Sequence, residues 1–73
     1  MAKRSKDPVY RVIDVVGSSA TSWEDAARSA VKTASKSLRD LRIAEVVKLD
    51  VRVDNGKVTA FRTRLALSFK YED

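Results

Sequence analysis

The side chains that could carry chemistry in this chain are carboxylates, amines, guanidinium groups and hydroxyls, because it contains neither histidine nor cysteine. That absence removes the commonest general base, the thiolate ligands of metals and every Ser-His or Cys-His nucleophile pair. No acid–base pair with catalytic spacing is recognisable among the remaining residues. The sequence therefore indicates a binding protein and not an enzyme.

Basic side chains gather at alternate positions of two extended segments in the C-terminal half. Lys48, Arg52, Arg62 and Arg64 all fall at even positions, with only Asp50 among them to offset their charge. Alternate residues of a strand share one face of a sheet, and neighbouring cations repel one another unless an acid or anion intervenes. We expect this face to hold phosphate-bearing ligands or ordered anions, with Lys48, Arg52 and Arg64 as the anion-binding candidates.

The overall charge raises a second class of function. The chain has 15 basic and 10 acidic residues, a formal net charge of +5, and three of the positive charges lie at Lys3, Arg4 and Lys6. We expect residues 1–8 to be a flexible basic tail in front of a domain at residues 9–73. Charge of this sign suggests nucleic acid as a partner. The sequence lacks the RNP aromatics and the GxxG loop of the known small modules, so nucleic-acid association ranks below small-ligand binding.

A length of 73 residues limits what the chain can stabilise alone. A domain of this size buries about 60% of its unfolded surface, so its core is marginal. Without cysteine there are no disulfides, and partner subunits are the remaining source of stability. No apolar run approaches the roughly 18 residues of a membrane span, and no apolar segment of a signal peptide follows the basic start. We expect a cytoplasmic protein that does not enter membranes.

Three segments predict strands, at residues 9–16, 43–53 and 57–71. They are rich in β-branched and aromatic residues, and residues typical of turns bound them. Residues 17–20 are expected to form a loop. The order of elements is therefore strand, helix, strand, strand, which is an α+β class of fold.

A single helix is predicted over residues 23–40, where apolar residues recur in steps of three and four. Thr21 and Glu24 fit a capping box at its start. The alternative interpretation is a phosphate cradle at the helix N-terminus, for which one glycine is too few. Trp23, the one tryptophan, is interpreted as a packing residue of the first turn.

Residues 54–56 mark a hairpin turn between the last two strands. A two-residue loop would pair Val53 with Val58, whereas a three-residue loop pairs Val53 with Lys57 and groups the apolar residues. We predict the three-residue loop, because a slip of one residue moves every side chain to the other face. On this register Val46 lies on the basic face, and the face toward the helix holds Val47, Leu49, Val51, Val53, Phe61, Leu65, Leu67, Phe69 and Tyr71.

The predicted strands are too long for the predicted helix to cover. The last strand spans about 50 Å at the rise of a strand, and the helix spans about 27 Å at the rise of a helix. Phe69 and Tyr71 would be exposed, and the edges of the sheet would be unpaired. We therefore predict a closed homo-oligomer. The alternative is a monomer with a solvated outer face.

Four segments together resemble the dodecin family: Tyr-Arg-Val-Ile-Asp-Val-Val-Gly-Ser-Ser at 10–19, Ser-Trp-Glu-Asp-Ala at 22–26, Ile-Ala-Glu-Val at 43–46 and Ser-Phe-Lys-Tyr-Glu at 68–72. The resemblance covers about residues 9–72, so the domain at 9–73 is dodecin-like. It implies a βαββ fold in which a three-stranded antiparallel sheet wraps one helix, and a hollow homododecamer of cubic symmetry. It also implies a cytoplasmic protein that binds and stores small ligands, typically flavins such as FMN, and catalyses nothing.

The resemblance places the family's flavin site at two positions of this chain. Flavin-binding members stack a tryptophan on the ring where this chain has Ile43, and a glutamine bonds the ring's polar edge where it has Arg62. Isoleucine has no π face, and ring stacking is worth about 0.5–1.5 kcal/mol beyond burial. Arginine only donates hydrogen bonds, while glutamine also accepts them. Ile43 and Arg62 are ligand-binding positions by resemblance, but flavin is not expected there in the usual stacked mode.

Family members that lack this tryptophan resemble a calcium-binding branch. Calcium takes about six to eight oxygen ligands, and the acids here do not follow the EF-hand spacing. Glu45 and Asp50 are the candidate metal ligands, in a site that several subunits would complete. The alternative for each is an ion pair with arginine at a subunit contact. The sequence thus predicts a homododecameric small-ligand storage protein of dodecin type, with calcium binding as its alternative function.

Overall fold

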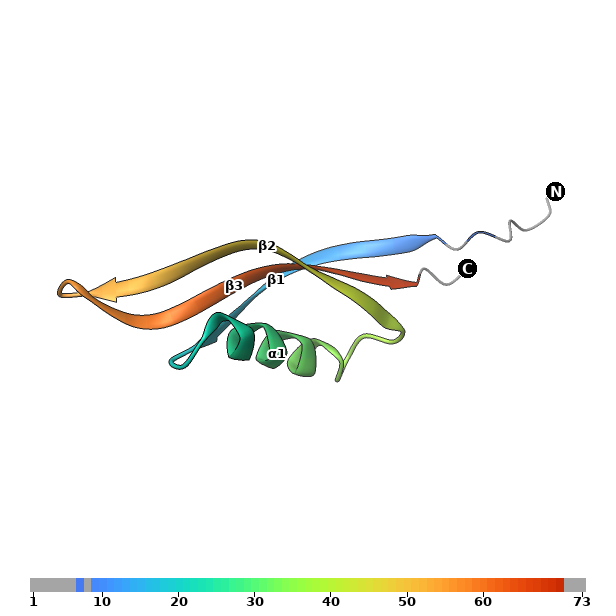
Figure 1. Cartoon of the computed structure of the whole chain (residues 1–73). Helices are drawn as coiled ribbons and strands as arrows, with labels where there is room; N and C mark the ends of the chain where they lie inside the picture. Colours follow the sequence, from blue (N-terminus) through green and yellow to red (C-terminus); the bar gives the residue numbers. More distant parts are fainter. Residues whose placement is uncertain (1–6, 8, 71–73) are drawn as a thin grey trace.

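The structure, a computed structural model, describes residue 7 and residues 9–70. Its elements are β1 (Tyr10–Ser19), α1 (Trp23–Ala34), β2 (Leu41–Asp54) and β3 (Lys57–Lys70). The strands form one antiparallel sheet in the order β1-β3-β2, and α1 lies along one side of it (Figure 1). The predicted α+β fold with βαββ order is confirmed. The tail predicted over residues 1–8 lies outside the described residues except for Asp7.

The helix begins at Trp23 as predicted, but its N-cap lies one residue later than the predicted Thr21. Ser22, not Thr21, is the N-cap, and its hydroxyl accepts a hydrogen bond from the Asp25 backbone N–H at 3.0 Å. The Asp25 carboxylate accepts a bond of 2.7 Å from the Ser19 hydroxyl, which itself accepts the Thr21 N–H at 2.9 Å. β1 continues through Gly17 to Ser19, where a loop was predicted. The cap is therefore tied to the end of the strand.

The helix also ends earlier than predicted, at Ala34 instead of residue 40. The Ser37 N–H reaches back three residues to the Ala34 carbonyl at 3.1 Å, and the Leu38 N–H bonds the same oxygen at 2.9 Å. These bonds close the last turn, and Asp40, with a φ of 54°, then redirects the chain into β2. Leu38 still packs against the core, but from the connection and not from the helix.

The core lies between α1 and the two strands β1 and β3. Its buried members are small on the helix and large on the sheet: Ala26, Ala30, Ala34, Leu65 and Leu67. The alanines let the helix approach so closely that a Cβ at Gly17 would lie 2.1 Å from the Ala26 carbonyl oxygen. Buried Thr63 donates its hydroxyl to the Trp23 carbonyl at 2.9 Å. Because α1 packs closely over β1 and β3, β2 lies largely outside the core.

The hairpin turn has two residues, so the predicted three-residue loop is wrong. Asn55 and Gly56 both take positive φ, 52° and 74°, and Val53 pairs with Val58. Positive φ at both central residues is the geometry that suits Asn-Gly between twisted strands. A register shift then leaves Thr59 without a partner on β2. This bulge aligns the apolar residues beyond the turn. The prediction had attributed that alignment to a longer loop.

A second register shift, at Val47, changes which face β2 presents. Val46 pairs with Leu65 and Lys48 pairs with Arg64, so Val47 has no partner on β3. An extra residue in one strand of a pair moves every side chain beyond it to the other face of the sheet. The predicted face of Val46 is therefore wrong. Val46 lies on the helix side with Ala44, while Glu45 lies on the opposite side of the sheet.

The helix leaves much of the sheet uncovered. The chain extends over 60 × 20 × 13 Å, whereas a helix of 12 residues spans only about 18 Å. The tip of the β2–β3 hairpin extends past both α1 and β1 (Figure 1). Many large apolar side chains are exposed: Val9, Tyr10, Val12, Val16, Trp23, Ile43, Val46, Val47, Leu49, Val53 and Val58. A single copy therefore leaves exposed the apolar surface that the predicted oligomer would bury.

We expect Gly17→Ala to lower the free energy of unfolding by roughly 3 kcal/mol, because the new methyl group would collide with helix backbone. Gly56→Ala is the matched control. Its Cβ would meet nothing within 4 Å, so only the positive φ adds a cost, of about 1 kcal/mol. Denaturant unfolding at one protein concentration measures both variants. Equal losses would contradict the close approach of α1 to β1.

Candidate ligand-binding face

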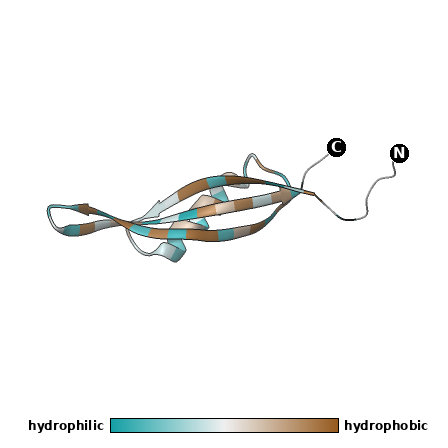
Figure 2. Ribbon diagram, turned by 90° about the horizontal axis from the view of Figure 1, so that it is seen from above, coloured by the Kyte–Doolittle hydropathy of each residue, from teal (hydrophilic) through white to brown (hydrophobic). Residues whose placement is uncertain are grey.

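We call the side of the sheet opposite α1 the open face; it faces the viewer in Figure 2, where polar and apolar residues intermix. Directly paired residues lie on the same side of a sheet, so the strand register defines rows across it. The four central rows are an ion-pair row (Ser18, Arg62, Asp50), a basic row (Val16, Arg64, Lys48), an acidic row (Asp14, Ala66, Glu45) and an apolar row (Val12, Ser68, Ile43). Arg52 lies nearer the turn, opposite Ala60.

Asp50 and Arg62 form a bidentate ion pair. Arg62 donates from Nε to Asp50 Oδ1 at 2.7 Å and from Nη2 to Oδ2 at 2.9 Å. The hydrogen bond from Arg62 holds the pKa of the Asp50 carboxyl below its ordinary value of 3.8, and the same pair raises the pKa of Arg62. Each carboxylate oxygen of Asp50 thus accepts one hydrogen bond from Arg62, which uses two of the five N–H donors of its guanidinium.

Trp23 fixes this ion pair relative to the helix. Its indole Nε1–H donates to the Asp50 carbonyl at 3.0 Å, and its ring meets Phe61 edge-on at a centroid distance of 5.1 Å. The Trp23 carbonyl accepts from Thr63. The predicted packing role of Trp23 is confirmed. The hydrogen bond to β2 was not predicted, because it depends on a contact 27 residues away in the chain.

The structure brings together two of the three predicted anion-binding residues. Lys48 and Arg64 are directly opposite each other in the basic row, an arrangement that is destabilising without a counter-charge. Among residues 9–70 neither of them forms an ion pair. Arg52 instead contacts Asp54 at the turn, with 3.3 Å between Nε and Oδ2. The basic row is therefore the part of the open face that can attract an anion.

The predicted metal candidates are not neighbours. Asp50 lies in the ion-pair row and Glu45 in the acidic row, with the basic row between them. Glu45 instead shares Ala66 with Asp14, which sequence reasoning passed over because their proximity requires β1 and β2 to flank β3. No group of three or more His, Cys, Asp or Glu that could hold a metal occurs within the described residues. A calcium site with six to eight oxygens would need neighbouring copies.

Ile43 lies on the open face, far along β2 from the Asp50 carbonyl that the Trp23 indole bonds. It is 61% exposed and belongs to the apolar row with Val12. The Asp50 position that Trp23 bonds is roughly 20 Å away along the strand. Trp23 therefore does not replace the ring that Ile43 lacks, and an isoleucine at this position does not fit a stacked flavin.

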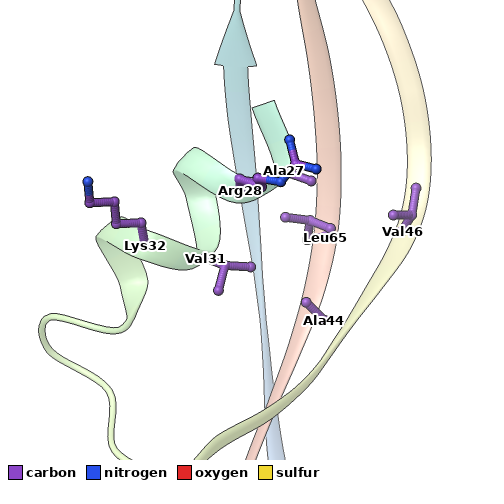
Figure 3. Close-up of a pocket in the computed structure, with 7 residues that line it drawn as sticks. All are labelled: Ala27, Arg28, Val31, Lys32, Ala44, Val46 and Leu65. Atoms are coloured by element: carbon purple, nitrogen blue, oxygen red, sulfur yellow. The ribbon is translucent and has the colours of Figure 1, made fainter. Parts of the chain in front are cut away.

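A separate apolar groove lies between α1 and β2. Its volume is about 350 Å³, and Figure 3 shows the residues that line it: Ala27, Arg28, Val31, Lys32, Ala44, Val46 and Leu65. The groove exists because α1 covers β1 and β3 while the shift at Val47 turns Ala44 and Val46 beneath it. A second groove of about 300 Å³ lies between α1 and β1. No helix within residues 9–70 is long and apolar enough to cross a membrane.

This βαββ arrangement is shared with solved structures. The dodecin from Streptomyces coelicolor superimposes with a TM-score of 0.87 at 35% identity, over 94% of this chain and 99% of that one. The calcium dodecin from Mycobacterium tuberculosis, a calcium-chelating antigen with a novel calcium-binding site, gives a TM-score of 0.78 at 48% identity, over 88% of this chain and 91% of that one. One helix on a three-stranded antiparallel sheet therefore defines the class of fold.

Comparison of sequences leads to the family. The dodecin family model matches residues 9–72. The calcium dodecin of Mycobacterium tuberculosis is 51% identical over 63 residues, which cover 85% of this chain and 87% of that protein. The chain belongs to the dodecin family.

We expect Arg62→Gln to raise the pKa of Asp50 toward its ordinary value, because the hydrogen bond from Arg62 is the main cause of its lowering. A depressed carboxyl pKa stabilises the folded chain above the ordinary value, and that contribution is lost as pH falls through the folded-state pKa. Titration of the Asp50 carboxyl by NMR measures the shift. Arg52→Gln is the matched control, since Arg52 contacts Asp54. An unchanged pKa in Arg62→Gln would contradict the bidentate pair.

Proposed function

We propose that this chain is a cytoplasmic, non-catalytic small-ligand-binding protein that assembles as a homododecamer and binds calcium in place of a stacked flavin. The proposal rests on which residues occupy the two flavin-site positions and on what those residues contact. Ile43 is exposed but has no ring, and Arg62, which donates two hydrogen bonds to Asp50, has no acceptor atom. Isoleucine therefore cannot stack on a flavin, and arginine cannot accept a hydrogen bond from the polar edge of its ring.

Assembly is supported by what a single copy leaves exposed. Large apolar residues are exposed on the open face, at the hairpin tip and in the groove beside α1. A chain of 73 residues gains little from its own core, so burial between copies is the remaining source of stability. The dodecamer itself is the assembly that the family resemblance implies.

Calcium is supported by chemistry and by similarity. The relative that is 51% identical is named a calcium dodecin. Of the two predicted ligands, Glu45 forms no ion pair among the described residues, whereas Asp50 is held by Arg62. Glu45 and Asp14 flank the small Ala66. We infer that Glu45 contributes carboxylate oxygens to calcium, and that neighbouring copies supply the remaining ligands.

Binding of phosphate-bearing ligands is the second candidate function. It is supported by the basic row, where Lys48 and Arg64 oppose each other without an ion-pair partner in residues 9–70. Anions such as the phosphates of FMN, coenzyme A or nucleotides would offset that charge. Association with nucleic acid remains the weaker alternative, because the open face offers no aromatic platform beside the basic row.

We expect Glu45→Gln to weaken calcium binding about tenfold or more, because calcium affinity depends on the number of charged ligands. Isothermal titration of the assembled protein with calcium alone measures the effect. Glu24→Gln is the control, since Glu24 lies in the first turn of α1, on the other side of the sheet. Calcium binding by wild type that neither variant changes would remove Glu45 from the site, and no binding at all would overturn the calcium function.

We expect Ile43→Trp combined with Arg62→Gln to gain flavin binding, because it restores a stacking ring and a donor–acceptor amide. Quenching of FMN fluorescence at low salt is the measurement, with wild type as the comparison. Tight quenching by wild type would contradict our reading of Ile43. Retention of FMN and coenzyme A alike by wild type in equilibrium dialysis, lost in Arg64→Ala, would instead favour the second candidate function.

A further inference from the structure

The groove between α1 and β2 is a hollow within a single chain, on the other side of the sheet from the open face (Figure 3). Its volume of about 350 Å³ lies within the range of about 300–1,000 Å³ that is usual for small-molecule pockets. Leu65, which is 1% exposed, lies between the two walls, and Val46 on the β2 wall is 52% exposed. The groove therefore has a packed base, an open side and the size of a site for a small molecule.

The lining of this groove is apolar except for two cations, Arg28 and Lys32, which both come from α1. They are four residues apart, so they are neighbours on the surface of the helix. Within residues 9–70 neither of them forms an ion pair, and no acidic side chain lines the groove. A molecule that matches this lining must combine hydrocarbon with negative charge.

Arg28 is the better placed of the two cations. In Figure 3 its side chain extends from α1 past Ala27 toward the strands, whereas the Lys32 side chain points away from them. Both side chains are exposed, so an anion can reach them. A guanidinium can donate two parallel hydrogen bonds to one carboxylate, while a lysine supplies a point charge on a flexible stem. Arg28 is therefore the expected anchor for a carboxylate, and Lys32 adds to the positive potential.

We propose that this groove binds a medium-chain carboxylate, with the alkyl chain between α1 and β2 and the carboxylate on Arg28. The helix wall from Ala27 to Val31 is about 6 Å long, and the strand wall from Ala44 to Val46 is about 7 Å long. Walls of this length suit an alkyl chain of medium length, which would cover the exposed Val46. The site goes beyond the proposed function, because it uses neither the acidic row nor the basic row of the open face.

The second groove of the chain, between α1 and β1, lacks this combination. It offers the hydroxyls of Ser18, Ser29 and Thr33 but no charged side chain. Hydrogen bonds in which both the donor and the acceptor are charged are stronger than those from neutral hydroxyls. A carboxylate therefore favours the groove beside β2 over the groove beside β1.

Isothermal titration of the wild-type chain, in its assembled form and with calcium chelated, tests the site with butyrate, hexanoate and octanoate. We expect the affinity to rise roughly fourfold for each methylene group added, as the burial of CH₂ groups in an apolar groove requires. Octylammonium has the same alkyl chain and the opposite charge, so it should bind at least about tenfold more weakly than octanoate. A neighbouring copy seated in the groove would exclude the acid, and absence of octanoate binding would overturn the proposal.

Variants of the groove locate the bound acid. Arg28→Gln should weaken octanoate binding roughly tenfold, because it removes the charged hydrogen-bond donor, and Ala44→Phe should abolish binding, because its ring would fill the groove. Arg39→Gln, beyond the end of α1, is the matched control and should bind octanoate as wild type does. If Ala44→Phe does not fold by circular dichroism, Arg28→Gln decides the matter. Octanoate binding that Arg28→Gln leaves unchanged and Arg64→Gln removes would assign the carboxylate to the basic row and overturn the groove site.

Discussion

Backbone pairing between β2 and β3 determines the surface chemistry of this protein. Because side chains alternate along a strand, one unpaired residue moves every side chain beyond it to the other side of the sheet. The unpaired residue at Val47 has that effect on β2. It directs Ile43 and Glu45 to the open face and turns Ala44 and Val46 toward α1. The acidic row, the apolar row and the groove beside the helix all depend on this single insertion.

The short helix and the long hairpin place the proposed ligand binding and the proposed assembly on the same surfaces. A helix lined by alanines approaches β1 closely but covers little area, so most of the sheet must find its complement elsewhere. The uncovered open face holds most of the exposed ionisable groups of the strands. A ligand there and a neighbouring copy there would contact the same side chains.

Composition and periodicity were sufficient for the order of elements, because β-branched runs and a helical stripe depend on local sequence only. They also placed Lys48, Arg62 and Arg64 on one face. The separation of Glu45 from Asp50 by the basic row could not be predicted, because a bulge leaves no mark in composition and changes only how two strands align. Asp14 was overlooked as a neighbour of Glu45 for a related reason, since its place depends on β1 joining the far edge of β3. Thr21 and Ser22 are neighbouring hydroxyl residues, and only the structure shows that Ser22 accepts the capping hydrogen bond.

The position of Trp23 has an optical consequence. It is the one tryptophan of the chain, and its indole joins the start of α1 to the backbone of β2 and to the Phe61 ring. Indole emission therefore reports a single junction, the one that holds helix and hairpin together, with no label attached. Separation of the helix from the hairpin would change the polarity around the indole and the quenching of its emission, while the sheet itself stayed paired. The protein thus contains its own fluorescent reporter of how tertiary contacts form relative to strands.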